Sequence, residues 1–488
     1  MTCVISDLLK DWPCTWIHGS FAHPIVGITD DSRKVKPGDV FVAINGRHEK
    51  GTDYIDEAIK RGAVCIISED KMPDLAHKEI AFATVPNTKT FLSHACSRIY
   101  GNPSHHLHVI AVTGTNGKTT VSHLIGQLLI AQGLKVAVIG TIGLFINGSK
   151  VNKLHSSLTT WSAPILHETL AYCLKENVTH VVLEASSMGL AQHRLDHCQI
   201  KQGILLNIGH DHLEDHAGLI DYQKSKRRLI ALSDSIVANE DDPFWFHHAK
   251  NCIQPVEWFN KKQVSIIEME SAKMTLCIEG VPQPTQVAFT GEYNASNLAA
   301  ALATLKQMGF SKEKIIPTLP SLSLPEGRFQ LIEKDHCKVL IDYAHTPEAM
   351  EQLLHSAARI AEGKLILVFG CGGDRDREKR TEMGKIAAYY ANEVWVTSDN
   401  PRSENPLDIC NEIISELEYS PTIHVEIDRK FAIEQALSRA NSKDIVLIAG
   451  KGHENTQQIG SVFIPFSDRK TVEDYLSELT RLNRNNKK

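Results

Sequence analysis

Several features that would indicate a specialised class of protein are absent from this 488-residue sequence. No apolar run approaches the ~20 residues that a membrane-spanning helix needs. The 11 cysteines include no Cys-x-x-Cys pair, and their odd number favours reduced thiols over a disulfide framework. A net charge of −6 argues against binding to nucleic acid or to a membrane surface through a basic patch. We therefore expect no nucleic-acid or membrane partner.

The sequence does have the composition of a globular protein. Hydrophobic residues make up 42% and charged residues 23%, which excludes a disordered chain. The length predicts roughly two to four domains with ample material for buried cores. The first ten residues include Asp7 and lack a signal-peptide core. Together with the reduced thiols, this predicts a cytoplasmic location.

The most informative stretch combines a strand, a glycine turn and a helix. Val109–Val112 predict a buried strand, Gly114–Gly117 form the turn, and Val121–Ile130 have a helical pattern. This order predicts a phosphate cradle, with Lys118 on phosphate oxygens and Thr119 on Mg²⁺. Position 112 is Val where the common P-loop has Gly, so the loop is a shortened form. The alternative is an ordinary strand–helix turn. ATP is the expected nucleotide.

Strands and helices alternate through the middle of the chain, with further strands expected over 135–140, 180–186 and 203–207. This alternation predicts a mainly parallel sheet that binds ligands at the carboxyl ends of its strands. Glu184 ends one such strand, where a carboxylate can complete the Mg²⁺ site begun by Thr119. The alternative is an acidic side chain that faces water.

Turn-forming clusters divide the chain into three α/β domains. Gly101–Ser104 precedes the nucleotide strand, and Pro325–Phe329 precedes the next apolar strand. We expect an N-terminal domain over 1–103, a central P-loop domain with a mainly parallel sheet over 104–330, and a Rossmann-like C-terminal domain over 331–488.

Titratable side chains cluster in residues 209–216, which hold three imidazoles and three carboxylates. Such a group suits a transition metal. The order resembles the His-x-His-x-Asp-His signature of metallo-β-lactamase-like hydrolases, but one residue too many separates His212 from Asp215. Further along, Lys226 lies in a basic helical stretch with Arg227 and Arg228. Locally, a solvated helix face is the favoured interpretation of this stretch.

The last domain is predicted to bring three polar loops to one edge of its sheet. Three expected strands end in Gly370–Asp376, Ser398–Arg402 and Ala449–Glu454. Because the carboxyl ends of parallel strands meet at one edge, these loops should converge on a site. Cys371 lies in the first loop, where a small buried residue is favoured over a nucleophile.

Together these motifs resemble those of the Mur ligases, the ATP-dependent amino-acid ligases of peptidoglycan synthesis. The resemblance rests on Gly-Thr-Asn-Gly-Lys-Thr-Thr at 114–120, Asp-Tyr-Ala-His-Thr-Pro at 342–347 and Gly-Lys-Gly-His-Glu at 450–454. Asp-Asn-Pro-Arg at 399–402 is similar to the marker of the diaminopimelate-adding branch. The resemblance covers essentially the whole chain. It implies addition of meso-diaminopimelate to UDP-N-acetylmuramoyl-L-alanyl-D-glutamate through an acyl phosphate, with release of ADP, in cell wall biogenesis.

The resemblance also implies roles for individual residues. Contacts to ATP are implied for Gly114, Thr115, Asn116, Gly117, Lys118, Thr119, Thr120, Asn297, Arg328 and Asp342. Contacts to the UDP substrate, in part through an N-terminal uridine-binding domain, are implied for Ser32, Thr159, Thr160, Ser186, Gln192 and Arg194. Contacts to diaminopimelate are implied for Arg375, Asp399, Asn400, Pro401, Arg402, Gly450 and Glu454.

Two Mg²⁺ ions are implied, with Thr119, Glu184, His212 and Lys226 as ligands and Lys226 modified to a carbamate. Lys118, Glu184, His212 and Lys226 form the implied catalytic group. The enzyme is expected to be a monomer that binds only small molecules. His210 is an imidazole that the family pattern does not explain.

Three other functions are weighed against this one. Folylpolyglutamate synthetase shares the ATPase domain but lacks the Asn-Pro-Arg loop and the N-terminal uridine-binding domain. A P-loop ATPase acting as a switch or motor would leave the polar loops of the last domain without a role. A zinc hydrolase fails on the spacing of the histidine cluster and predicts tightly bound zinc.

Overall fold

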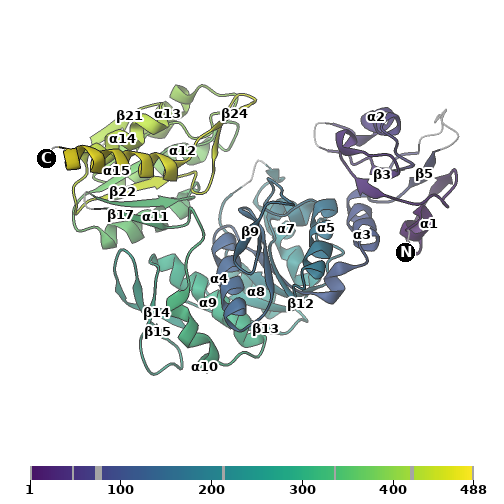
Figure 1. Ribbon diagram of the computed structural model, residues 1–488, viewed down its shortest axis with the longest axis horizontal. Coiled ribbons are helices and arrows are strands. Elements are labelled where there is room, and N and C mark those ends of the chain that lie inside the picture. Colours follow the sequence, from purple (N-terminus) through teal and green to yellow (C-terminus); the bar gives the residue numbers. More distant parts are fainter. Residues whose placement is uncertain are drawn as a thin grey trace.

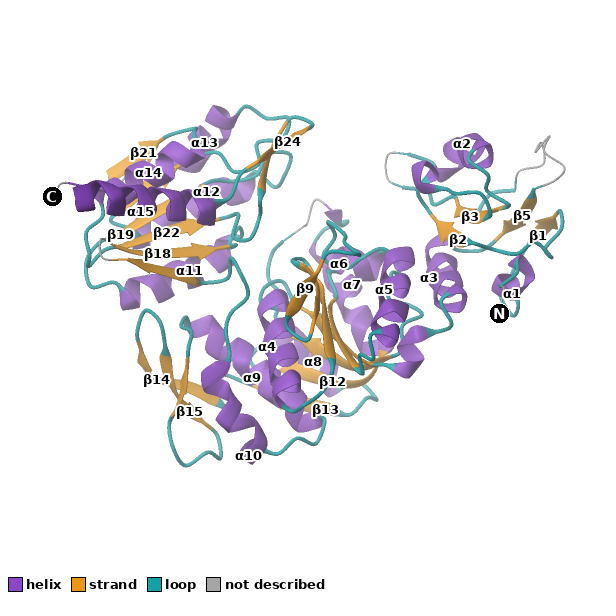
Figure 2. Cartoon of the chain, viewed as in Figure 1, coloured by secondary structure: helices purple, strands orange, loops and turns teal. Residues whose placement is uncertain are grey.

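The computed structural model describes residues 3–46, 49–71, 80–211, 215–334, 337–417 and 422–485. These residues form three α/β units along an arc, with the central unit in the middle and the two ends of the chain at its outer ends (Figure 1). Each unit places helices against a sheet (Figure 2). The predicted three-domain α/β fold is confirmed. No helix in the described part of the chain is long and apolar enough to cross a membrane.

The N-terminal unit is a small mixed sheet in the order β1-β5-β4-β3-β2. All neighbouring pairs are parallel except β1 with β5. Its strands are β1 (Trp16–His18), β2 (Gly27–Thr29), β3 (Asp39–Val42), β4 (Cys65–Ser68) and β5 (Ala81–Thr84), and its helices are α1 (Ile5–Leu9), α2 (Ile55–Lys60) and α3 (Thr88–Ile99). Short 3₁₀ turns, η1 (Ser32–Lys34), η2 (Gly51–Tyr54) and η3 (Pro103–His106), complete it.

The central unit is built on a sheet in the order β13-β12-β11-β6-β10-β7-β8-β9, parallel from β13 to β7. Its strands are β6 (His108–Thr113), β7 (Val136–Gly140), β8 (Gly143–Ile146), β9 (Ser149–Val151), β10 (His180–Glu184), β11 (Ile200–Leu205), β12 (Ser233–Asn239) and β13 (Val256–Phe259). Its helices are α4 (Lys118–Ala131), α5 (Ala163–Lys175), α6 (Ser187–Ala191), α7 (Leu219–Leu232), α8 (Pro243–Lys250), α9 (Glu292–Gln307) and α10 (Lys312–Ile315), followed by η5 (Ile316–Ser321).

The apolar run of β6 packs on both faces of this sheet. Ile110 and Val112 belong to the cluster beneath α4 and α9, whereas Val109 and Ala111 belong to the cluster on the α5 face. A strand covered on both faces needs an unbroken apolar sequence, because alternate side chains point to opposite sides. The central position of the nucleotide strand therefore follows from its composition.

A small antiparallel sheet, β14-β15-β16, is attached beside α9, and the sequence patterns did not identify it. It comprises β14 (Val264–Met269), β15 (Met274–Ile278) and β16 (Thr285–Val287). Its inward residues Val264, Met274 and Leu276 join the same core cluster as α4 and α9. The sheet thus extends the central core without adding a separate one.

The C-terminal unit is a sheet in the order β17-β18-β22-β19-β20-β21, parallel except where β17 pairs with β18. Its strands are β17 (Gln330–Lys334), β18 (Cys337–Asp342), β19 (Leu365–Phe369), β20 (Glu393–Val396), β21 (Thr422–Val425) and β22 (Ile445–Ala449), and its helices are α11 (Pro347–Ile360), α12 (Glu378–Tyr390), α13 (Pro406–Ile414), α14 (Arg429–Arg439) and α15 (Asp468–Asn485). A hairpin of β23 (Thr456–Ile459) and β24 (Val462–Pro465) precedes α15.

Candidate active site

The turn between β6 and α4 is shaped by glycine. Gly117 caps α4 with a φ of 89°, a conformation that residues with a Cβ rarely adopt. A Cβ at this position would also lie 2.6 Å from Oδ1 of Asn297. The missing side chain lets the turn fold closely against α9. The N–H groups of the first turn of α4, which have no partner within the helix, then face this turn and suit an anion.

Two side chains that the sequence analysis did not assign hold the turn in place. The amide of Asn207, just after β11, accepts a hydrogen bond from Asn116 N at 2.8 Å and donates to Asn116 O at 3.1 Å. The hydroxyl groups of Tyr222 and Thr115 lie 2.7 Å apart. Tyr222 lies one helical turn before Lys226, and this spacing on α7 was the signal that both face the interior.

Lys118 and Lys226 both point at this turn. Nζ of Lys118 donates to the carbonyl oxygens of Gly114 and Thr115, each at 2.9 Å. Nζ of Lys226 donates to the same Gly114 oxygen at 2.6 Å. The prediction of a solvated face at Lys226 is wrong, because this residue is only 1% exposed.

Burial changes the acid–base properties of both lysines. Burial lowers the pKa of Lys118, and the negative charges of Glu184 and Asp211 partly oppose this shift. The pKa of Lys226 lies well below its ordinary value because of burial and, secondly, the charge of Lys118. A neutral Lys226 amine can act as a nucleophile, which an ammonium cannot.

Glu184 ends β10 beside the P-loop helix and is 2% exposed, so it does not face water. Its Oε2 accepts hydrogen bonds from the hydroxyl groups of Thr119 and Thr141, each at 3.0 Å, and its Oε1 accepts one from Thr141 N at 2.9 Å. A buried carboxylate next to a threonine hydroxyl offers the hard oxygen ligands that Mg²⁺ prefers. The residues present therefore fit the implied metal.

A pocket of about 60 Å³ is lined by residues of the turn and of the central and C-terminal units. Its lining includes Asn116, Gly117, Thr120, Asn297, Arg328 and Asp342, all of which the resemblance assigned to ATP. Burial raises the pKa of Asp342, while the charge of Arg328 opposes that effect. The Arg328 guanidinium lies 4.5 Å from the centre of the Tyr343 ring and donates to the Thr119 hydroxyl at 3.3 Å.

The residues expected to bind the UDP substrate form one hydrogen-bonded group in the central unit. The Thr160 hydroxyl donates to Glu184 O at 2.8 Å and lies 3.1 Å from that of Ser186. Arg194 donates to Thr160 O at 2.6 Å and to the side chain of Gln192. Thr159 joins through Thr141, whose hydroxyl donates to the Thr159 hydroxyl at 3.1 Å.

One residue expected to bind the UDP substrate, Ser32, stands apart from this group. Ser32 is buried in the N-terminal unit, where its hydroxyl donates to Glu57 at 2.7 Å, and no hydrogen bond among the described residues joins it to Thr160 or Arg194. His212 lies outside the described residues. Oδ2 of Asp211 lies 4.0 Å from Nε2 of His345, so Asp211 borders the C-terminal unit.

The three polar loops of the C-terminal unit meet, as the sequence predicted. Arg402 donates to Gly373 O, which joins the loops after β20 and β19. Asn400 donates to Oε2 of Glu454 at 3.0 Å, which joins the loops after β20 and β22. A Cβ on Gly450 would lie 2.7 Å from Asp399, and one on Gly373 would lie 1.9 Å from Pro401 O. Glycine is thus needed where the loops pass one another.

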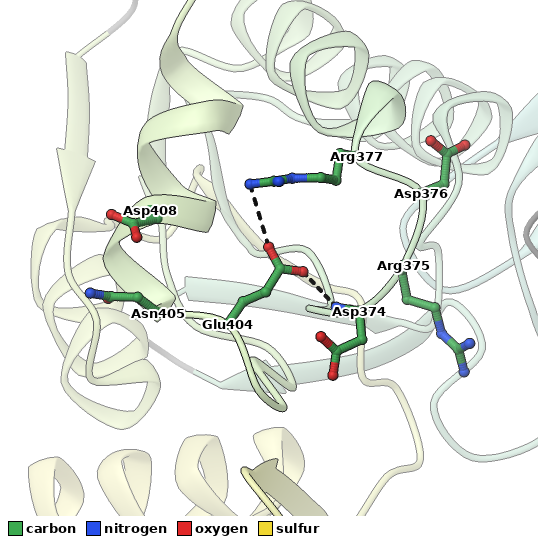
Figure 3. Close-up of a pocket in the computed structure, with 7 residues that line it drawn as sticks. All are labelled: Asp374, Arg375, Asp376, Arg377, Glu404, Asn405 and Asp408. Carbon is green, nitrogen blue, oxygen red and sulfur yellow. Dashed lines mark hydrogen bonds and ion pairs between the residues drawn. The ribbon is translucent and has the colours of Figure 1, made fainter.

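Two arginine side chains lie against Gly372 at this edge: a Cβ on Gly372 would lie 2.9 Å from Nη1 of Arg402 and 3.7 Å from Cγ of Arg375. The pKa of Arg402 is lowered by burial and then by the charge of Arg375, with Asp399, Asp374 and Glu454 opposing. Arg375 belongs to the rim of a 540 Å³ pocket that also includes Asp374, Asp376, Arg377, Glu404, Asn405 and Asp408 (Figure 3). Two neighbouring cations suit a carboxylate, which each can bind through paired N–H groups.

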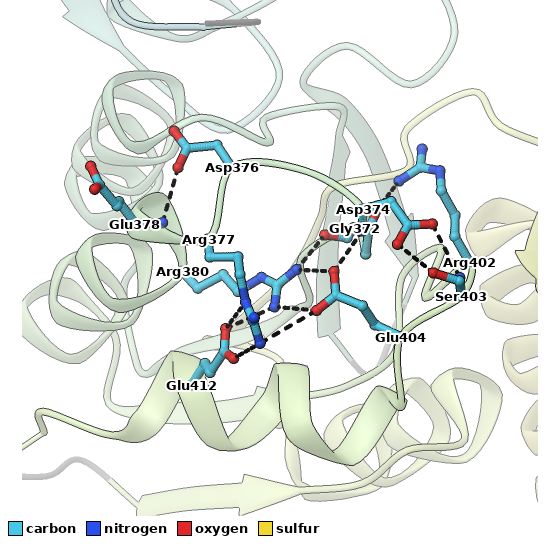
Figure 4. A network of polar contacts seen from close by, with 11 residues as sticks. Gly372, Asp374, Asp376, Arg377, Glu378, Arg380, Arg402, Ser403, Glu404 and Glu412 are labelled. Atoms are coloured by element: carbon cyan, nitrogen blue, oxygen red, sulfur yellow. Dashed lines mark hydrogen bonds and ion pairs between the residues drawn. The ribbon is translucent and has the colours of Figure 1, made fainter. Parts of the chain in front are cut away.

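A buried cation fixes the loops around this pocket. Arg380, in α12, is fully buried and binds Glu404 at 2.8 Å and Glu412 at 2.7 Å (Figure 4). It also donates to Gly372 O at 3.2 Å. The hydrogen bonds from Arg380 lower the pKa of Glu404 to about 2. Cys371 is buried and burial raises its pKa to about 12, so the expectation of a small buried residue is confirmed.

Comparison with known families covers all three units. Residues 24–100 match the model of the Mur ligase family catalytic domain, 112–305 that of the Mur ligase middle domain, and 327–452 that of the Mur ligase glutamate ligase domain. The chain belongs to the Mur ligase family. It is therefore an ATP-dependent, amide-forming ligase. The match over 24–100 covers the N-terminal domain that folylpolyglutamate synthetase lacks, which argues against that alternative. The zinc hydrolase and switch ATPase alternatives are wrong, because the chain belongs to a ligase family.

Several relatives of this Mur ligase share one name. UDP-N-acetylmuramoyl-L-alanyl-D-glutamate–2,6-diaminopimelate ligase from Geobacillus thermodenitrificans is 34% identical, with 95% of this chain and 97% of the relative covered. The ligase of that name from Aquifex aeolicus is 36% identical, with 93% and 94% covered. A solved structure with the same name has a TM-score of 0.66 at 32% identity and covers 98% of this chain and 100% of its own.

Proposed function

We propose that this Mur ligase joins meso-diaminopimelate to UDP-N-acetylmuramoyl-L-alanyl-D-glutamate, with ATP converted to ADP and phosphate, as a step of peptidoglycan precursor synthesis. The observation that supports the choice of amino acid is that the side chains of Arg375 and Arg402 both lie against Gly372, at the edge where the loop of Glu454 meets the loop of Asn400. Diaminopimelate carries a carboxylate and an ammonium at each end. A site with two cations and nearby carboxylates complements both ends of such a molecule.

The reaction begins with activation of the substrate carboxylate. A carboxylate oxygen attacks the γ-phosphorus of ATP, the bond to the bridging oxygen breaks, and ADP leaves, which gives an acyl phosphate. Lys118 and the N–H groups of the turn neutralise charge on the transferring phosphoryl group. Mg²⁺, held by Thr119 and Glu184, would supply further charge neutralisation there.

The second step joins the two substrates. The neutral amine nitrogen of diaminopimelate attacks the acyl carbon and the bond from that carbon to the phosphate oxygen breaks. The amide forms, and the proton lost from the nitrogen leaves with the phosphate. We assign the α-carboxylate of the amino acid to Arg375 and its distal carboxylate to Arg402. Asp399 and Glu454 then balance the distal ammonium. Because water would hydrolyse the acyl phosphate, closure of the C-terminal unit over the central one is expected to accompany this step.

We also propose that Lys226 becomes a carbamate. Its amine has a lowered pKa, and a neutral amine can attack CO₂ and lose a proton to give a carbamate anion. This reaction replaces a neutral amine next to Lys118 with an anion that can bind Mg²⁺. The role of His212 as a second metal ligand, the domain boundaries after 103 and 330, the monomeric state and the cytoplasmic location remain predictions.

The proposed function is tested by an omission series. ADP release is measured with ATP, UDP-N-acetylmuramoyl-L-alanyl-D-glutamate and meso-diaminopimelate, and then with each substrate left out in turn. Sustained ADP release is expected only with all three. Equal ADP release without the UDP substrate would contradict the proposal, because no carboxylate would then be activated.

A further inference from the structure

Lys451 is a buried lysine where the loops after β20 and β22 meet, and it is not among the residues proposed to touch a substrate. It follows Gly450 in the loop after β22, and its side chain is 0% exposed. An ammonium group removed from water is costly unless a counter-charge and hydrogen bonds replace the lost water. The hydrogen-bond partners of Lys451 therefore indicate what this buried ammonium group does.

Both partners of this ammonium belong to the proposed amino-acid site. Nζ of Lys451 donates to Oε2 of Glu454 at 2.7 Å and to Oδ1 of Asn400 at 3.1 Å. Lys451 thus connects the loop after β22 with the loop after β20. The negative charge of Glu454 balances the positive charge of Lys451, whose side chain is buried away from water.

The same contacts fix the orientation of the Asn400 amide. Its Oδ1 accepts from Lys451 and from Gln458 N at 2.9 Å, so the oxygen must face these two donors. Its Nδ2 then points to Oε2 of Glu454, to which it donates at 3.0 Å. A rotated amide would lose all three hydrogen bonds, which makes the arrangement unique.

Glu454 is consequently held by one oxygen. Its Oε2 receives both Lys451 and Asn400, whereas its Oε1 has no hydrogen bond within the described part of the chain. The side chain is 30% exposed, so its second oxygen can reach a ligand. A carboxylate fixed in this way is ready for an ammonium without a search among rotamers.

We propose that Lys451 is a positioning residue for the amino-acid substrate. Its ammonium orients Asn400 and Glu454 so that one oxygen of Glu454 faces the amino-acid site and receives an ammonium of the substrate. This inference rests on the proposed function and adds a residue that acts through Glu454 without touching the substrate.

The inference predicts a specific kinetic change in Lys451→Met. Methionine keeps the apolar stem, and the partly exposed Glu454 carboxylate can rehydrate, so the variant is expected to fold. Its KM for diaminopimelate should rise at least ~10-fold, because one positioned charge contact is worth about that factor. Its KM for ATP should stay within about twofold. The matched control is Lys430→Met in α14, where the lysine is 64% exposed, and it should resemble wild type in both constants.

A double-mutant cycle distinguishes positioning from a general structural role. If Lys451 acts through Glu454, then Lys451→Met should add little to the KM of Glu454→Gln, since contacting residues are not additive. The inference would be overturned if the rise in the KM for diaminopimelate in the double variant equalled the product of the rises in the two single variants. It would also be overturned if Lys451→Met raised the KM for ATP as much as the KM for diaminopimelate. If Lys451→Met is insoluble, Lys451→Gln, which can still bond Asn400, takes its place. Insolubility of both would show that Lys451 serves the fold and would also overturn it.

The wild-type enzyme separates this inference from the proposed function. If wild type does not ligate diaminopimelate, the proposed function is contradicted and the positioning role falls with it. If wild type does ligate it and folded Lys451→Met has an unchanged KM for diaminopimelate, only the positioning role is wrong.

Discussion

Lys118 and Lys226 donate hydrogen bonds to one backbone oxygen, that of Gly114, at 2.9 and 2.6 Å. Two ammonium groups this close would repel each other in a buried site. The pKa of Lys226 is lowered by burial and by Lys118, so the protein can relieve the repulsion by leaving Lys226 neutral. The two lysines of the nucleotide turn are therefore chemically different, one suited to phosphate and the other to modification.

Replacement of Lys118 by alanine is expected to abolish ligation and to leave the fold intact. The variant loses the cation over the transferring phosphoryl group, which should lower kcat by ~10²-fold or more. The measurement is steady-state ADP release together with a thermal melt. Turnover near that of wild type in a folded Lys118→Ala protein would contradict the assigned role of the turn.

Replacement of Lys226 by alanine is expected to leave the enzyme nearly inactive. If a carbamate is the working form, short carboxylates such as formate or acetate should restore part of the activity by occupying the vacated anion position. The matched control is Lys224→Ala, since Lys224 lies on the same helix but is exposed. Intact-mass and ¹³CO₂ labelling of wild type provide an independent measurement. A free amine under saturating bicarbonate, or no rescue at any carboxylate concentration, would oppose the carbamate.

Arg402→Ala tests the recognition of the distal carboxylate. The variant should lose at least ~100-fold in kcat/KM for diaminopimelate, because a carboxylate of the substrate would be left unpaired. Lysine, which lacks that carboxylate, should gain little. The control is Arg481→Ala, an exposed arginine in α15 of the same unit. A surface ion pair at Arg402 would be worth only ~0–1 kcal/mol and would leave kcat/KM almost unchanged.

A buried histidine predicts how stability depends on pH. Burial lowers the pKa of His167 to about 3, with a smaller contribution from the charge of His197. As pH falls below about 6.5, the unfolded chain binds a proton that the folded protein excludes, so the free energy of unfolding decreases by ~1.4 kcal/mol per pH unit.

His167→Gln removes this proton linkage. Between pH 7 and pH 5, the difference in unfolding free energy between wild type and variant should shift by about 2 kcal/mol against wild type. Urea denaturation followed by tryptophan fluorescence at both pH values measures it. A difference that stays constant between the two pH values would show that His167 binds its proton equally in both states.

The nucleotide turn and the three loops of the C-terminal unit could be predicted because each depends on local sequence. An apolar strand followed by glycines fixes the turn after β6, and a polar loop after each apolar strand fixes the edge where Arg402 and Glu454 meet. The charged neighbours Arg227 and Arg228 predict a solvated face at Lys226, which is wrong because Lys226 is buried. Tyr222 and Lys226 are one helical turn apart and so share the buried face of α7. A lysine on a buried face is unusual, which is why the sequence favours the exposed one.

Other parts of the site depend on contacts between distant segments. Arg380 meets Glu404 and Glu412 across 24 and 32 residues, and nothing in the local pattern of α12 distinguishes it from an exposed arginine. Asn207 holds Asn116 across 91 residues for the same reason. These pairings appear only when β strands bring their ends to one edge of a sheet.

The central claim is most directly tested by a competition between amino acids. Wild-type enzyme is given ATP, UDP-N-acetylmuramoyl-L-alanyl-D-glutamate and equal concentrations of meso-diaminopimelate and L-lysine, and the nucleotide products are separated by mass. The product that carries diaminopimelate is expected to exceed the lysine product by at least ~100-fold. Equal amounts of the two products, or an excess of the lysine product, would contradict the assignment of the amino-acid site.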